Sequence, residues 1–313
     1  MAGELKIFTG RSHPELSRLI TQSLGMELGR SVTTDLPNET LEVQILENVR
    51  ECDVFYVQTA SAPLHTHVFE TFLAIDALKS ASARRVTAVL PYVPYVRSDK
   101  KDKPRISIAA RLMADLLLAS GADRVLTMDL HAPQVQGFFR VPTDQLQAAN
   151  ILCDYLERQD LSNAVIIAAD AGEAKDVGRY ANKLNLPIAI IDKRRLRDGD
   201  DSPASVDLIG DVRGKLALII DDEIASAKTL VEATDFLLQR GAAEVKAVAS
   251  HGVFSGKALE LIAQSPVTEV IVTDTIPLIG QKPDKIKVLS VAGLFARAIQ
   301  RIHDGNSVSA LFR

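Results

Sequence analysis

Two adjacent carboxylates at the end of an apolar run are the residues with the clearest chemical use. Asp221 and Asp222 follow residues 216–220, LALII, which are typical of a central strand in a parallel sheet covered on both faces. They are therefore expected at the carboxyl edge of the sheet, where ligands of open α/β folds bind. A helix opens just beyond them, and its first N–H groups favour anions. The stretch predicts a site for a phosphate ester.

Other apolar runs are also followed at once by an acidic residue or a histidine. These residues are His131, Asp170, Asp192, His251 and Asp274. Because the carboxyl ends of parallel strands share one edge of a sheet, the repetition predicts a shared polar site. His251 has a simpler interpretation as well, that of a histidine bonded to a local backbone group. His65 and His67 are interpreted as part of a surface turn, because no carboxylate cluster stands near them.

Two basic loops could supply positive charge to such a site. Residues 91–105, PYVPYVRSDKKDKPR, follow an apolar run, and residues 193–197 read KRRLR. Proline is excluded from central strands, which indicates that the first segment is an exposed loop. Its composition alone slightly favours a solvated charged loop that binds nothing.

Strand-like runs alternate with helical segments along the chain. This alternation indicates the fold that positions the residues above. Residues 69–80 and 106–120 have helical patterns between apolar runs. This alternation predicts an α/β fold with parallel strands and helices on both faces of each sheet. The rhythm restarts near residues 140–150, and we therefore predict two domains, residues 1–145 and 146–313.

Composition narrows the class of protein. The chain has 313 residues, 47% of them hydrophobic and 24% charged, with no long apolar segment, a profile typical of a soluble globular protein without a membrane partner. Its first residues, MAGELKIFTG, lack the pattern of a signal peptide. Cys52 and Cys153 are far apart in the sequence, which favours reduced thiols in a cytoplasmic protein. A net charge of −4 argues against broad nucleic-acid binding.

Several common nucleotide motifs are missing from the sequence. There is no GxGxxG after a strand, no GxxxxGK[ST] and no GxSxG, which removes dinucleotide binding, a P-loop and a nucleophile elbow as simple interpretations. Carboxylates, one well-placed histidine and basic loops remain. This set suits Mg²⁺ and phosphate chemistry, because Mg²⁺ prefers oxygen ligands and keeps several waters.

The chain resembles the ribose-phosphate pyrophosphokinases, or PRPP synthetases, along essentially its whole length. The segments that carry the resemblance are VQILENVR (43–50), DLHAPQVQGFF (129–139), IDKRR (191–195), FSG (254–256), TDTIP (273–277) and the tail LSVAGLFARAIQRIHDGNSVSALF (289–312). The resemblance implies two phosphoribosyltransferase-type domains. It implies transfer of the diphosphoryl group of Mg-ATP to the 1-hydroxyl of ribose 5-phosphate, giving PRPP and AMP. A homo-oligomer, from dimer to hexamer, is also implied.

The resemblance also assigns roles to individual residues. It implies that Lys193 and Arg195 act on a mobile catalytic loop, where they neutralise the transferred diphosphoryl group. The further assignments are Arg97, Asp99 and Asn38 for the nucleotide, Asp221, Asp222, Ser226, Lys228 and Thr229 for ribose phosphate, and His131 and Asp170 for the metal. A guanidinium and an ammonium aimed at phosphoryl oxygens would stabilise the spread negative charge.

Three binding loops depart from the family pattern. Residues 36–40, LPNET, replace Phe-Ser-Asp-Gly-Glu and lose the aromatic ring; residues 170–176, DAGEAKD, add two acids where a polyanion binds. Residues 221–229, DDEIASAKT, replace two glycines of the family loop by Ala227 and Lys228, and Ala225 removes a carboxylate. Side chains at the glycine positions hinder a positive φ and fill space near the phosphate. Lys228 could compensate as a point charge.

Three functions are therefore compared. The first is an active ribose-phosphate diphosphokinase, favoured by retention of His131, Asp170, Lys193 and Arg195. The second is a catalytically impaired homologue that binds a nucleotide and regulates a catalytic paralogue, favoured by the altered loops. The third is a transcription regulator, disfavoured because the chain has neither an added helix-turn-helix nor a basic face.

Overall fold

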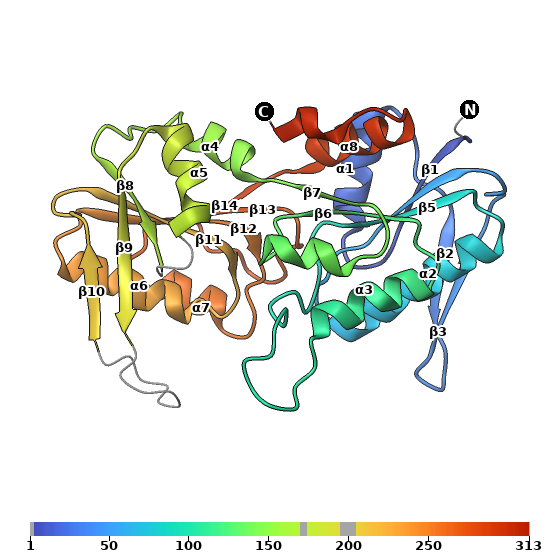
Figure 1. Cartoon of the computed structure of the whole chain (residues 1–313), viewed down its shortest axis with the longest axis horizontal. Helices are drawn as coiled ribbons and strands as arrows, with labels where there is room; N and C mark the ends of the chain where they lie inside the picture. The colour runs from blue at the N-terminus through green and yellow to red at the C-terminus, as the bar shows by residue number, and fades with distance from the viewer. Residues whose placement is uncertain (1–2, 170–173, 195–204, 313) are drawn as a thin grey trace. The chain divides into compact units, whose positions relative to one another are not determined.

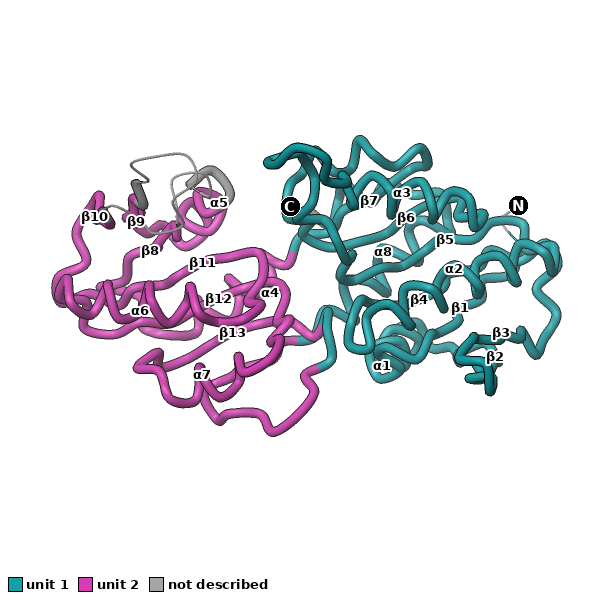
Figure 2. The backbone as a smooth tube through the Cα atoms, turned by 90° about the horizontal axis from the view of Figure 1, so that it is seen from below, with its two compact units in different colours: residues 1–147, 275–277, 290–313 teal, residues 148–274, 278–289 magenta. Residues whose placement is uncertain are grey.

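Two mainly parallel sheets form the framework of the computed structural model, which describes residues 3–169, 174–194 and 205–312 (Figure 1). The chain divides into two compact units (Figure 2). The first unit contains residues 1–147, 275–277 and 290–313, and the second contains residues 148–274 and 278–289. The predicted α/β fold with helices on the sheet faces is confirmed. These units differ from the predicted domains, which have one boundary after residue 145. The difference arises because residues 275–277 and 290–313 belong to the first unit.

The first unit holds a five-stranded sheet in which every pair is parallel. Its order is β1, β4, β5, β6, β7, and the bounds are Leu5–Thr9, Asp53–Val57, Arg85–Leu90, Arg124–Met128 and Thr143–Leu146. All five residues of β4 are buried, as expected of a central strand covered on both faces. The carboxyl ends of these strands form one edge of the sheet.

Helices cover both faces of this first sheet. Figure 1 shows α1 (Pro14–Leu24) and α8 (Ala292–His303) on one side and α2 (Leu64–Ser80) and α3 (Ala109–Ala119) on the other. Two short 3₁₀ helices, η1 (Pro133–Phe138) and η2 (Val308–Phe312), complete the unit. α8 packs on α1 and buries Phe295 and Ile299 completely. The predicted helix 69–80 begins earlier, at Leu64, which places His65 and His67 in the first turns of α2 rather than in a surface turn.

An antiparallel hairpin extends from the first unit. β2 (Ser31–Asp35) pairs with β3 (Leu41–Ile45), and Asp35 faces Leu41 next to the turn. Both strands alternate between half-buried and exposed residues, because only one face of the hairpin packs on the protein, where β3 contacts α2. Residues 36–40 form the hairpin tip.

The second unit holds a seven-stranded sheet in the order β10, β9, β8, β11, β12, β13, β14. The strand bounds are Ser205–Ile209, Ile188–Arg194, Ala164–Ala168, Leu216–Ile224, Glu244–Gly252, Glu269–Thr273 and Ile286–Leu289. All pairs are parallel except β9 with β10, which is antiparallel. β11 is central and lies between β8 and β12.

Four helices flank the second sheet. α4 (Ala149–Leu156) and α5 (Ala174–Leu184) lie on one face, and α6 (Lys228–Gln239) and α7 (Ala258–Gln264) lie on the other (Figure 1). Side chains of α6 and α7 form one apolar core with alternate residues of β8, β11 and β12. This core holds the strand that carries the predicted ribose-phosphate carboxylates.

Candidate functional site

The paired carboxylates lie within the last part of β11. The sequence predicts them after the end of the strand. Asp221 pairs with Ala249 of β12, and the strand continues to Ile224. Both Asp221 and Asp222 are half-buried. The backbone N–H of Asp222 donates to Asp221 Oδ1 at 2.8 Å, which fixes the orientation of the Asp221 carboxylate. The predicted carboxyl-edge position is otherwise retained.

The loop between β11 and α6 adopts a left-handed backbone at one of the two altered glycine positions. Ala227 has φ 60° and ψ 1°, is buried, and stands just before the first residue of α6. Lys228 is the first helical residue, and positive φ is not found there. The structure thus retains a glycine-like conformation at Ala227 alone, where a Cβ makes that conformation costly.

The polar residues predicted for ribose phosphate sit around this turn. Ser226, Lys228 and Thr229 are exposed, and the first N–H groups of α6 lie beside them. Asp221 and Thr229 also line a cavity of about 20 Å³ whose other walls are apolar. That volume accommodates about one water molecule, so a sugar phosphate would bind on the exposed edge above the cavity.

A second loop supports the turn through its backbone. The N–H of Phe254 donates to the carbonyl of Ile224 at 3.0 Å, and the N–H of Ser255 donates to the carbonyl of Ala225 at 2.9 Å. Gly252 makes this possible, because a Cβ there would stand 2.5 Å from the Phe254 ring. The sequence identifies the FSG segment only as a point of resemblance to the family, because its role here depends on backbone hydrogen bonds between segments that are distant in the sequence.

Two of the predicted nucleotide residues, Arg97 and Asp99, and the predicted metal ligand His131 follow adjacent strands of the first unit. Arg97 is exposed and Asp99 is half-buried in the loop after β5, while His131 is exposed after β6. Gln134 of η1 donates from Nε2 to Asp99 Oδ2 at 3.4 Å. This contact connects the loop after β5 to the segment that carries His131.

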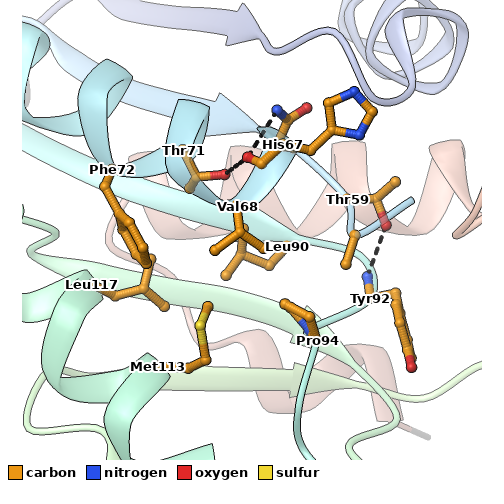
Figure 3. A pocket seen from close by; sticks show the side chains of 12 residues that line it. Thr59, His67, Val68, Thr71, Phe72, Leu90, Tyr92, Pro94, Met113 and Leu117 are labelled. Carbon is orange, nitrogen blue, oxygen red and sulfur yellow. Dashed lines mark hydrogen bonds between the residues drawn. The ribbon is translucent and has the colours of Figure 1, made fainter. Parts of the chain in front are cut away.

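An apolar pocket lies beneath the first part of the loop after β5 (Figure 3). Figure 3 shows Pro94 of that loop opposite Met113 of α3, and Tyr92 also lines the pocket. The N–H of Tyr92 donates to Thr59 Oγ1 at 3.2 Å. Thr59 in turn donates to the carbonyl of Thr275 at 2.6 Å. These bonds anchor the base of the loop that carries Arg97 and Asp99.

Asn38 is exposed at the tip of the β2–β3 hairpin. Its Oδ1 accepts hydrogen bonds from the N–H of Thr40 at 3.3 Å and from Thr40 Oγ1 at 2.7 Å. The side-chain oxygen therefore shapes the turn, as asparagine commonly does. Glu39 adopts a positive φ of 65° in the same turn.

The remaining predicted residues have limited structural description. Asp170 and Arg195 lie outside the described residues. Lys193 lies in β9, where it pairs with Val206 of β10, and thus occupies a strand rather than the predicted loop. The roles predicted for these three residues stay predictions.

The carboxyl-edge residues are distributed over two sheets rather than one. His131 belongs to the first sheet and Asp221 and Asp222 to the second. Among the described residues, no group of three or more His, Cys, Asp or Glu side chains is arranged to hold a metal. The two adjacent carboxylates nevertheless fit Mg²⁺, which binds through one or two carboxylates and completes its shell with water and substrate phosphates. In the described part of the chain no helix is both long and apolar enough to cross a bilayer.

Comparison with known families matches both ends of the chain. Residues 5–121 match the N-terminal domain of ribose phosphate pyrophosphokinase, and residues 200–313 match the phosphoribosyl synthetase-associated domain.

Curated relatives match the chain over nearly its full length. A ribose-phosphate pyrophosphokinase of Caldanaerobacter subterraneus is 48% identical over 310 residues, which cover 98% of each chain. One of Deinococcus radiodurans is 49% identical over 314 residues, again covering 98% of each. The crystal structure of phosphoribosylpyrophosphate synthetase from Mycobacterium smegmatis superposes with a TM-score of 0.92 at 37% identity, covering 97% of this chain and all of that one.

Proposed function

This chain belongs to the ribose-phosphate pyrophosphokinase family, and from that membership we infer that it forms PRPP from ATP and ribose 5-phosphate. The 1-hydroxyl oxygen of ribose 5-phosphate attacks the β-phosphorus of ATP. The bond from that phosphorus to the α,β-bridging oxygen breaks, the hydroxyl proton leaves, and AMP departs. The observation that carries this assignment is similarity over the whole chain rather than at one motif.

We propose that the turn between β11 and α6 binds ribose 5-phosphate. Asp221 and Asp222 would accept hydrogen bonds from ribose hydroxyls, and Ser226 and Thr229 would donate to the phosphate. The N–H groups at the start of α6 favour the same anion. Lys228 would add a positive charge at the position where the family has glycine.

The nucleotide would bind through the first unit. Arg97 would pair with phosphate oxygens, because a guanidinium can donate two parallel hydrogen bonds. Asp99 and Asn38 would contact polar groups of the nucleoside. Lys193 and Arg195 would neutralise charge on the diphosphoryl group as it transfers, and such charge stabilisation is the main source of catalysis in phosphoryl transfer.

Mg²⁺ is the cofactor that the family implies. His131 and Asp170 are the residues we propose for the metal, and Asp221 and Asp222 provide the carboxylate pair that fits it. Bound Mg²⁺ neutralises phosphate charge and orients the phosphoryl groups. The protein residues then have to hold ribose and nucleotide in line and exclude water.

We propose two further properties, an oligomeric state and a location. A homo-oligomer is supported by the exposed apolar side chains Phe69, Leu112 and Leu116 on α2 and α3, since such side chains often mark contacts between copies. A monomeric mass in solution would contradict it. A cytoplasmic location is supported by the buried free cysteines Cys52 and Cys153, and labelling that finds the protein outside the cytoplasm would contradict it.

The altered loops favour a second candidate function, a nucleotide-binding regulatory subunit. Ala227 holds a strained conformation at the point where the phosphate must approach, and the hairpin tip has no aromatic ring. A subunit that regulates a catalytic paralogue would retain the fold and nucleotide binding but lose turnover.

Phosphorus NMR with Mg-ATP and ribose 5-phosphate distinguishes these functions. The wild-type protein should give PRPP and AMP, and Asp221→Asn/Asp222→Asn should lower the rate by about 100-fold or more, the scale of losing charge-stabilising groups. Asp235→Asn, an exposed change on α6, is the matched control and should retain activity. Folded wild-type protein that binds ATP but makes no PRPP would refute the first function in favour of the second.

A further inference from the structure

A carboxylate buried in the first unit accepts hydrogen bonds from three separate segments of the chain. Glu70 of α2 is completely buried. Its Oε1 accepts from Thr33 Oγ1 of β2 at 2.8 Å and from the backbone N–H of Arg11 at 3.3 Å. Its Oε2 accepts from Gln58 Nε2, beyond β4, at 2.9 Å. Burial of an ionised carboxylate is tolerated only when its oxygens are satisfied in this way.

Arg11 connects this buried carboxylate to the hairpin. Its Nε lies 3.4 Å from Glu70 Oε1. Its Nη1 and Nη2 donate to Asp35 Oδ2 and Oδ1 at 2.8 and 3.2 Å. One guanidinium thus bridges an internal and an external carboxylate. A planar fork suits this geometry, and lysine could not reproduce it.

The bridge ends at the base of the hairpin tip. Asp35 is the last residue of β2 and is followed directly by residues 36–40. Thr33 binds Glu70 from the same strand, so the hairpin is fixed at two points two residues apart. A two-stranded hairpin is marginally stable by itself. Its orientation therefore depends on these contacts and on the packing of β3 against α2.

Arg11 and Asp35 each favour the charged form of the other. The hydrogen bond from Arg11 is the main cause that lowers the pKa of Asp35. The same hydrogen bond is the main cause that raises the pKa of Arg11, and Glu70 adds to the increase. Asp35 is exposed to solvent, and screening by salt weakens exposed pairs.

We propose that Arg11 is a positioning residue for the nucleotide: by pairing with Glu70 and Asp35 it sets the orientation of the hairpin whose tip carries Asn38. The inference rests on the proposed nucleotide role of that tip. Arg11 itself does not contact the reacting atoms. Its loss should therefore weaken nucleotide binding and leave the ribose-phosphate turn, which lies in the other unit, unaffected.

Steady-state kinetics of Arg11→Gln test the functional half of this inference. The KM for ATP should rise about fivefold or more, since small misplacement of a positioning group has effects of that order. The KM for ribose 5-phosphate should stay within about twofold of the wild-type value. Arg11→Lys should recover only part of the loss. Arg18→Gln, which breaks the exposed pair with Glu15 on α1, is the matched control and should leave both constants unchanged.

Hydrogen exchange tests whether Arg11 fixes the β2–β3 hairpin, and this measurement does not require enzyme activity. Amides of β2 and β3 should exchange faster in Arg11→Gln than in wild type, whereas those of β5 should not change. Unchanged exchange in the hairpin would overturn the inference. So would faster exchange with an unchanged KM for ATP. If wild-type protein makes no PRPP, the proposed function fails while the exchange result still decides whether Arg11 fixes the hairpin.

A charge swap distinguishes the contribution of Asp35 from that of Glu70. Arg11→Asp/Asp35→Arg restores an opposite-charge pair at the hairpin but places a carboxylate beside buried Glu70. If both partners matter, the swap should be no better than Arg11→Gln in the KM for ATP. Recovery to the wild-type KM would show that the surface pair alone is sufficient and would refute the role of Glu70.

Discussion

Ala227 is the residue that most clearly connects an altered motif to a physical cost. Its φ of 60° is costly for any residue with a Cβ, by about 1 kcal/mol or more. The surrounding contacts impose this conformation, because the N–H groups of Phe254 and Ser255 hold the preceding backbone. The turn thus places an alanine side chain at a position whose backbone conformation favours glycine.

Ala227→Gly should improve binding of ribose 5-phosphate. Glycine removes the left-handed strain and the Cβ next to the phosphate path, so the KM for ribose 5-phosphate should fall about threefold or more. Stability should change by less than about 1 kcal/mol, because relief of strain opposes the greater chain entropy of glycine.

Ala233→Gly, in the interior of α6, provides the comparison for that change. It should lower the free energy of unfolding by about 1 kcal/mol or more, because Ala233 is also buried in the core, without lowering the KM. Enzyme assays and thermal denaturation measure both effects. An Ala227→Gly protein with an unchanged or higher KM would show that the turn does not limit binding.

Residue types in the sequence indicate a candidate site only where they recur along one segment. Asp221, Asp222, Ser226, Lys228 and Thr229 lie within nine residues, and the structure places them at the end of β11, in the turn that follows and at the start of α6. Arg11 and Glu70 are 59 residues apart, and neither has a distinctive sequence context. Their pairing arises from the fold, and no local pattern could predict it.

At the scale of elements, long buried strands were predictable and short edge strands were not. The apolar run 216–220 forms the first part of β11 and begins at the same residue, because an apolar strand covered on both faces has a strong pattern. β7 and β14 have four residues each, too few to establish a period. The β2–β3 hairpin carries polar residues on its exposed face, and its strands therefore lack the apolar run that marks a buried strand.

A hydrogen bond between two elements of the second unit provides a test that depends on pH. Tyr155, in α4, donates to Glu269 Oε1 at the start of β13 at 2.5 Å. Burial raises the pKa of Glu269, but hydrogen bonds from Tyr155, Gln159 and Lys246 outweigh that effect and the net pKa is lowered. Burial and the same carboxylate raise the pKa of Tyr155 to about 12.

Tyr155→Phe should lower the free energy of unfolding at pH 7 by about 1.5–3 kcal/mol, the usual contribution of a hydrogen bond to a charged group. A carboxylate with a lowered folded pKa stabilises above its unfolded pKa, here 4.5, and that contribution disappears as pH falls through the folded value. The difference in the free energy of unfolding between wild type and Tyr155→Phe should therefore shrink below pH 4.5.

Alkaline conditions give an independent check on the same pair. A tyrosine with a raised folded pKa stabilises fully below its unfolded pKa of 10 and loses that contribution as pH rises toward about 12. Stability of the wild type should thus fall over this window more steeply than that of Tyr155→Phe. Urea denaturation at several pH values measures these differences, and a constant difference from pH 3 to 11 would contradict the assignment of this bond.

At the scale of the whole molecule, the first unit is assembled from both ends of the chain. α8, near the C-terminus, packs on α1, and its Phe295 and Ile299 are completely buried. Polar contacts add to this packing. His303 Nδ1 lies 2.8 Å from Asp53 Oδ2, and Arg85 bridges Asp53 and the carbonyl of Ile302. Asp53 is itself buried.

Removal of residues 290–313 should therefore unfold the N-terminal sheet, although no strand of that sheet is deleted. Loss of two large buried side chains alone costs about 6 kcal/mol or more, comparable to the total stability of a domain. Limited proteolysis should cut within residues 1–147 first. Arg301→Gln, an exposed substitution on α8 that removes one surface contact, is the control. Native-like protease resistance of the truncated chain would contradict this dependence.

The same chain path affects how the protein is made. When residue 147 leaves the ribosome, every strand of the first sheet has been synthesised, but the helix that covers the α1 side has not. At about 5–20 residues per second, the remaining chain takes roughly ten seconds or longer to appear. During that interval the apolar face awaiting Phe295 and Ile299 is available to other nascent chains or to chaperones. The N-terminal half is thus the first to be synthesised and cannot be the first to finish folding.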